Sequence, residues 1–267
     1  MDQKEWNIDW TRVKAQTLWS FEDLIKMLLS VLAYDFVQRH YNHTLNQALR
    51  YALSIRRGYL QERGDMAAHI DRIASYIEDL ERRWSGSYSD LVRQIETRGQ
   101  CLAFLQDTGF EFDQLIQLLN YLLRWVLPFK APLREFIDTG SNVDVKMLEG
   151  LREQGIKSNL DLLEAGCTAA GRQQLANKLE LPVSQILALV HRADISRLAY
   201  VRGKTVRHLC GAGYDTLEKI ASADVAEIEV KMGAYYETLG KTLADFKAVI
   251  PLPWMIGGAQ TLPRGVV

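Results

Sequence analysis

Basic side chains are concentrated in one stretch of this sequence, and they are the residues best suited to chemistry with an anion. The stretch runs from residue 192 to residue 207 and holds one acid, Asp194, together with five cations: Arg192, Arg197, Arg202, Lys204 and Arg207. An arginine donates two parallel hydrogen bonds to a phosphate group, and a lysine contributes a point charge. The stretch therefore predicts contact with a nucleic-acid backbone, or with an acidic surface of another protein or of another copy of this chain.

Short helices must position these side chains, because residues that end and start helices alternate at short intervals in this half of the chain. Gly155 and Gly166 are expected to end helices, and Thr168 and Asp194 are expected to cap the N-termini of others. Pro182 stands at a favoured first helical position. This punctuation predicts a compact array of short helices instead of a long bundle.

The order and spacing of four motifs in this half resemble a known family. They are "LLEAG" at 162–166, Gly171-Arg172 with Leu175-Ala176, "RADISRL" at 192–198 and "GYDTLEKIA" at 213–221. Over about residues 148–232 the chain resembles a bacterial and archaeal family of domains of unknown function, described as two consecutive helix-hairpin-helix-like units. The resemblance implies a compact tandem helix-hairpin-helix (SAM-like) domain over residues 145–250. Residues 1–145 resemble no family that we can name.

The second hairpin departs from that family at its turn. The family usually carries a Gly-hydrophobic-Gly turn after the "RADISRL" helix, and the two glycine positions fall here on Tyr200 and Arg202. Glycine permits a positive φ and the close approach of a phosphate, whereas tyrosine at a positive φ is strained. We therefore expect a turn of another shape. Side chains would then replace main-chain amides as phosphate contacts, and the expected contact residues in this hairpin are Arg197, Arg202, Gly203, Lys204 and Arg207.

The first hairpin offers fewer candidates. Its tip contains Thr168, an expected helix cap, and Arg172, the one basic residue between Gly166 and Lys178. Many nucleic-acid readers of this class need two paired hairpins for useful affinity. One basic tip and one nearly neutral tip therefore predict feeble, sequence-independent binding that depends strongly on salt.

The amino-terminal half is expected to be a helical bundle of about five helices over residues 1–140. Its clearest periodicity predicts a heptad-like seam at Met66, Ile70, Ile73, Ile77, Leu80 and Trp84. We expect the seam to pack in an antiparallel hairpin spanning residues 66–107. The sequence "DTGSNVD" at 138–144 is the expected linker between the two halves.

Little in either half predicts catalysis. The chain has no glycine-rich phosphate loop and no nucleophile elbow. His40 and His43 can share a helix face, but the Glu-x-x-His motif typical of bundle metal sites is missing. We expect no cofactor, no metal and no enzymatic activity. The leading hypothesis is a non-enzymatic nucleic-acid-binding protein, and the alternatives are a protein-interaction or scaffolding module and a ligand-binding bundle.

Composition and the two ends of the chain complete the expectations. The formal charge is −1, so no global field favours an anionic partner. Three cysteines without metal-ligand spacing, a polar start and short apolar runs predict a cytoplasmic protein that does not enter a membrane, and a homo-oligomer stays open. The tail at 251–267 is expected to be extended and apolar. It either packs against its own domain or a partner chain, or is disordered.

Overall fold

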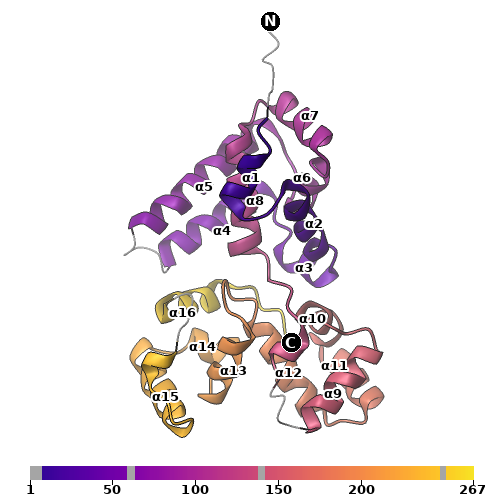
Figure 1. Ribbon diagram of the computed structural model, residues 1–267, viewed down its shortest axis with the longest axis vertical. Coiled ribbons are helices and arrows are strands. Elements are labelled where there is room, and N and C mark those ends of the chain that lie inside the picture. Colours follow the sequence, from indigo (N-terminus) through magenta and orange to yellow (C-terminus); the bar gives the residue numbers. More distant parts are fainter. Residues whose placement is uncertain (1–7, 59–63, 138–141, 247–250) are drawn as a thin grey trace, which may run out of the picture. The chain divides into compact units, whose positions relative to one another are not determined.

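The molecule is built from helices. The computed structural model describes residues 8–58, 64–137, 142–246 and 251–267, and all regular elements in those ranges are helices (Figure 1). The described residues also contain two isolated β-bridges, one between Thr44 and Ser87 and one between Pro132 and Ser158. The predicted all-α class is confirmed. The chain divides into two compact units, Met1–Leu127 and Pro128–Val267.

The first unit contains more and shorter helices than the five expected. Its elements are α1 (Thr11–Thr17), α2 (Phe21–Leu32), α3 (Asp35–Tyr41), α4 (Leu45–Gly58), α5 (Gly64–Arg83), α6 (Tyr88–Gln94), α7 (Arg98–Thr108), α8 (Phe112–Tyr121) and η1 (Leu122–Val126).

The predicted seam on α5 exists, but its main partner is different. Ile70, Ile73, Ile77 and Leu80 are fully buried, and α5 packs chiefly against α4 and also against α8. The expected return helix is split in two, because capping boxes at Ser87 and at Thr97 start α6 and α7 separately. The hairpin is therefore α4–α5, and the prediction of a 66–107 pair was wrong.

The second unit begins with a short 3-10 turn, and a run of helices follows that turn. Its elements are η2 (Leu133–Glu135), α9 (Asn142–Glu153), α10 (Asn159–Gly166), α11 (Ala169–Leu179), α12 (Val183–Ile195), α13 (Gly203–Gly211), α14 (Leu217–Ala221), α15 (Val225–Thr238), η3 (Leu243–Asp245) and α16 (Leu252–Thr261).

The segment before the expected linker belongs to the second unit. Asn159, fully buried, fixes this segment at several points. Its main-chain N–H donates to Ala131 O at 3.0 Å, its side-chain oxygen accepts from Ala131 N at 2.8 Å, and its side-chain amide donates to Phe129 O at 2.8 Å. The unit boundary therefore lies at 127/128 and not in the expected linker. Of that linker, residues 138–141 lie outside the described residues and the rest begins α9.

The tail also differs from its expected extended form. Pro251 precedes α16 and a second proline stands in its first turn, positions that suit proline because no intrahelical N–H is needed there. Trp254, Met255 and Ile256 are buried, and α16 packs against α14 and α15. The apolar tail thus covers its own unit, as one of the two alternatives predicted.

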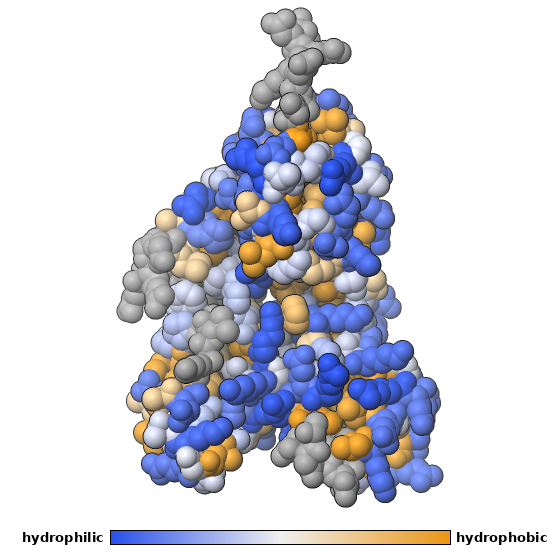
Figure 2. Space-filling model, in the orientation of Figure 1, coloured by the Kyte–Doolittle hydropathy of each residue, from blue (hydrophilic) through white to orange (hydrophobic). Residues whose placement is uncertain are grey.

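The surface is mixed in character. Hydrophilic residues dominate the face shown in Figure 2, with apolar residues scattered among them. Among the described residues, the exposed large apolar side chains are Leu18, Phe129, Val230, Leu239 and Val267. Within those same residues, no helix combines the length and apolar character needed to cross a bilayer.

Candidate nucleic-acid interface

The turn of the second hairpin keeps a left-handed residue where the family would have its first glycine. Tyr200 has φ +61°, so the expectation of another turn shape was wrong at this position. Buried Val201 anchors the turn, and its N–H donates to Leu198 O at 3.1 Å. At the second glycine position, Arg202 is extended and precedes α13 without a side-chain cap. Packing around Val201 thus holds a backbone shape that costs a tyrosine roughly 1–2 kcal/mol.

The start of α13 is covered by the segment that enters the unit. The Arg202 guanidinium lies 3.6 Å from the centre of the Phe129 ring. Gly203 is buried, and a Cβ added to it would lie 2.6 Å from the carbonyl carbon of Glu135. Because the Glu135 main chain lies this close, Gly203 serves helix packing in the structure.

Arg197 lies in the interior of the unit. Its side chain is fully buried and pairs at 2.6 Å with Asp194, whose side chain is 4% exposed. Both terminal nitrogens of Arg197 donate to Pro263 O at 3.0 Å. Asp194, the expected N-cap, lies instead in the last turn of α12. Since its donors are used internally, Arg197 presents no surface to a ligand.

Arg172, in the first hairpin, is also buried and donates hydrogen bonds within the unit. Its side chain donates to Gly166 O at 3.2 Å, to Cys167 O at 3.0 Å and to Val267 O at 2.7 Å. Arg172 is 7% exposed. Thr168 accepts a 3.1 Å hydrogen bond from Gly171 N and caps α11, which confirms its predicted role as a helix cap. The first hairpin tip therefore carries no exposed cation between Gly166 and Lys178.

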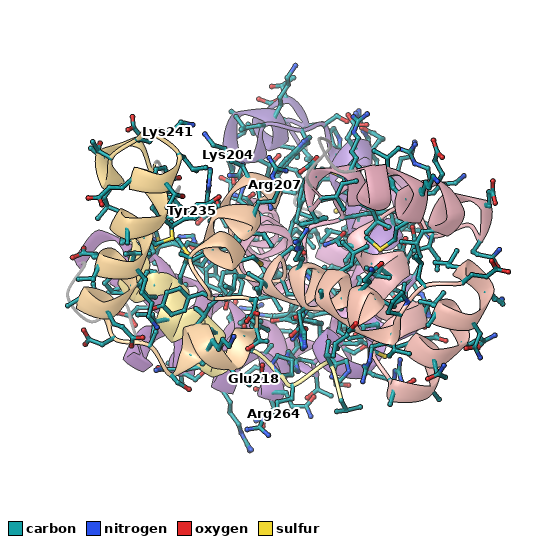
Figure 3. The ribbon with its side chains drawn as sticks, turned by 90° about the horizontal axis from the view of Figure 1, so that it is seen from below. Lys204, Arg207, Glu218, Tyr235, Lys241 and Arg264 are labelled. Atoms are coloured by element: carbon teal, nitrogen blue, oxygen red, sulfur yellow. The ribbon has the colours of Figure 1, made fainter. Side chains whose placement is uncertain are left out.

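Two of the predicted residues do reach the surface of the second unit. Lys204 is exposed, and Arg207 is partly exposed while one of its terminal nitrogens donates to Glu135 O. A third cation, Lys241, lies near them at the end of α15 (Figure 3). We call Lys204, Arg207 and Lys241 the basic cluster. None of the three forms an ion pair with a carboxylate among the described side chains.

The positive charges of all three cations act on the imidazole of His208. Burial lowers the pKa of His208 first, and the positive charges of Lys204, Arg207 and Lys241 lower it further. The imidazole centre is 5.0 Å from the ring centre of Tyr236 and 5.9 Å from that of Tyr235. Tyr235 is partly exposed and lies beside the cluster in Figure 3.

Sequence reasoning missed Lys241 and Tyr235. Neither lies in the basic stretch, and α13 contacts α15 only through the tertiary fold. The local sequence around them, "YYETLGKTL", has the pattern of a helix that ends at a glycine, and nothing in it indicates an anion. One acid is close by: Asp245 accepts from Thr242 N at 2.8 Å and from Thr242 Oγ1 at 3.1 Å, and these bonds, with a smaller contribution from Lys241, lower its pKa.

A separate groove lies along α12 near the end of α13. Its volume is about 310 Å³, and its lining residues include His191, Arg192, Cys210 and Asp215. Burial raises the pKa of the Cys210 thiol to about 11, so the thiol is protonated at neutral pH. Arg192 donates to Phe136 O at 2.8 Å. The groove therefore lacks an activated nucleophile.

His40 and His43 in the first unit lie beside aromatic rings. His40 lies 4.7 Å from Phe36, and His43 lies 5.6 Å from Tyr51 and 6.1 Å from Tyr88, measured between ring centres. In the part of the chain that the structure describes, no three or more His, Cys, Asp and Glu side chains are placed to hold a metal ion.

Comparison with known proteins identifies part of the second unit. Residues 142–246 match the family described as "Domain of unknown function (DUF4332)". This region is similar to that family. The match includes the 148–232 region in which the resemblance was noted, and it covers less than half of the chain. No curated protein and no solved structure matches the chain.

The DUF4332 region is completed by chain on both sides of it. Glu135, which accepts from Arg207, lies before the match, and Pro263, which accepts from Arg197, lies after it. Buried Trp254 also lies beyond the match. The compact unit is therefore longer than the DUF4332 match at both ends.

Proposed function

We propose that the second unit binds nucleic-acid backbone, without sequence preference, through the basic cluster and the neighbouring ring of Tyr235. The observation that carries this proposal is the convergence of Lys204, Arg207 and Lys241 around His208, without an ion pair from any of the three to a described side chain. Unpaired cations on one surface are the electrostatic footprint of a phosphate contact.

In this proposal the residues expected from sequence have different roles. Lys204 and Arg207 supply the contact, whereas buried Arg172 and Arg197 support the fold. Arg202 lies over Phe129 and is half-buried, so it is placed beside the contact and not at its centre. With three cations, binding would be weak, and log K would fall with log salt at a slope of about −2.7 for duplex DNA and about −2 for single strands.

The test is fluorescence anisotropy with labelled duplex and single-stranded DNA and RNA, titrated at low and at physiological salt. The variant Lys204→Ala/Arg207→Ala/Lys241→Ala is expected to lower affinity at least tenfold, because it removes every cation of the cluster. The matched control is Lys146→Ala/Lys219→Ala/Lys231→Ala, which removes the same charge from exposed positions outside the cluster and is expected to change affinity less than threefold.

Three results would contradict the proposal. They are no binding by the unmodified protein at low salt, an equal loss in both variants, and a slope near zero in the salt titration.

An acidic protein surface is the second candidate for the same cluster, because a carboxylate satisfies arginine and lysine as a phosphate does. Competition separates the two partners. Displacement of labelled DNA by polyglutamate at equal charge concentration would favour an acidic protein, whereas displacement by unlabelled DNA alone supports the proposal.

A further inference from the structure

Building on the proposed function, we infer that the basic cluster receives the terminal phosphate monoester of a nucleic-acid strand in preference to an internal phosphodiester. The inference depends on the small number of cations that lie together and on which cations of the hairpin are already engaged. It specifies which phosphate of the strand the site takes.

Lys204, Arg207 and Lys241 lie close together on one side of the second unit (Figure 3). Lys204 and Arg207 are three residues apart on α13 and therefore share one side of that helix. Lys241 approaches from the end of α15, and the charges of all three act on the single imidazole of His208. Cations that follow successive phosphates would have to extend along a strand, but Arg197 and Arg202 are engaged within the unit.

Charge decides between the two kinds of phosphate. An internal phosphodiester carries one negative charge, whereas a phosphate monoester carries about −1.5 to −2 at pH 7 and has three acceptor oxygens. Three neighbouring cations complement a single multiply charged group better than a group with one charge. Arg207 is also held in place through Glu135 O, so its remaining donors are oriented before any ligand arrives.

His208 and Tyr235 provide two further features that suit a strand end. The Nδ1 atom of His208 is buried without a hydrogen-bond partner among the described residues. A dianion bound among the cations would offset their effect and raise the pKa of His208. The groups that face this imidazole are Lys204 and Arg207 from α13, Tyr235 and Tyr236 from α15, Lys241, and Phe246 after η3. The partly exposed Tyr235 ring is a surface on which the terminal base can stack.

The experiment compares oligonucleotides of one sequence that carry a 5′-phosphate, a 3′-phosphate or hydroxyls at both ends, using anisotropy on the whole protein at physiological salt. We expect the phosphorylated strands to bind about five- to tenfold more tightly than the hydroxyl strand, because the end carries additional charge. Below about pH 6 the monoester gains a proton, so the preference is expected to shrink. In the triple alanine variant of the cluster the preference is expected to disappear.

NMR of the His208 ring provides an independent readout. The pKa of His208 is expected to rise when a phosphorylated strand is added, and to rise less with the hydroxyl strand. A merely structural role of the cluster would leave this pKa unchanged.

The outcomes separate the inference from the proposed function. Equal affinity for phosphorylated and hydroxyl strands would overturn the inference and leave backbone binding intact. Absence of binding to any strand at low salt would remove the proposed function. A mononucleotide 5′-phosphate that competes as well as the oligonucleotide would show that a free phosphate monoester is the ligand, so monoester selectivity would stand without nucleic-acid binding.

Discussion

The two hairpins of the second unit use the same residue types for different purposes. In the first hairpin, Arg172 is buried and donates to three main-chain carbonyls, and the tip around Thr168 has no exposed cation. In the second, Arg197 is buried in the same way, but Lys204 and Arg207 remain at the surface. The difference shows that Arg172 and Arg197, which donate to main-chain oxygens inside the unit, cross-link the fold, whereas Lys204 and part of Arg207 remain exposed.

The acceptors of these arginines come from distant parts of the chain. Arg172 reaches Val267, Arg197 reaches Pro263, and Arg207 reaches Glu135. A hydrogen bond from a charged donor contributes about 1.5–3 kcal/mol, so each arginine stabilises the segment that it holds. The two hairpins are therefore fastened to the start and the end of the unit, and only part of the positive charge is left for a ligand.

The largest loss of stability is expected from Arg197→Met. Removing this guanidinium leaves Asp194 buried without its partner, and the free energy of unfolding should fall by about 3–5 kcal/mol in urea denaturation. The double variant Asp194→Asn/Arg197→Met should recover part of this loss, because the uncompensated charge is gone. A loss below about 1 kcal/mol in the single variant would show that Arg197 is not a cross-link.

The next largest loss of stability is expected when a buried cation of the first hairpin is compared with an exposed cation of the second. Arg172→Met should lower the free energy of unfolding by about 2–3 kcal/mol, because it removes the hydrogen bonds of a charged donor to Gly166 O, Cys167 O and Val267 O. Lys204→Met should change it by less than about 0.5 kcal/mol, because Lys204 is exposed. Urea denaturation of the two variants measures both values. Similar losses of unfolding free energy in the two variants would show that Arg172 and Lys204 do not differ in their structural roles.

The smallest loss of stability is expected from substitutions that crowd the starts of two helices, α11 and α13. Gly203→Ala and Gly171→Ala each place a methyl group against a main-chain carbonyl, that of Glu135 and that of Ala165 respectively. Each should lower the free energy of unfolding by about 1–3 kcal/mol. The control Gly233→Ala lies in α15 with no atom within 4 Å of the added Cβ, and it should stabilise by up to about 1 kcal/mol. Thermal or urea unfolding gives the sign, and a neutral Gly203→Ala would show that Glu135 does not hold α13.

Local sequence predicted the helical class, several helix starts and part of the candidate site. Thr168 caps its helix as expected from the sequence, because a cap depends on residues three apart. The α5 seam was visible for the same reason, since helical periodicity places its buried residues on one face. The capping residues at Thr97 and Gln100 were also present in the sequence, and they would have shown that the expected return helix is split.

The sequence by itself determined the all-α class and the concentration of positive charge between residues 192 and 207. Tertiary structure decided which of those charges face solvent, because that depends on carbonyls brought in from residues 135 and 263. It also decided that Lys241 and Tyr235 join Lys204 and Arg207, and that Tyr200 holds a positive φ. The physical reason is range: caps and periodicity act over a few residues, whereas burial of an arginine or convergence of charges depends on segments that meet only in the folded chain.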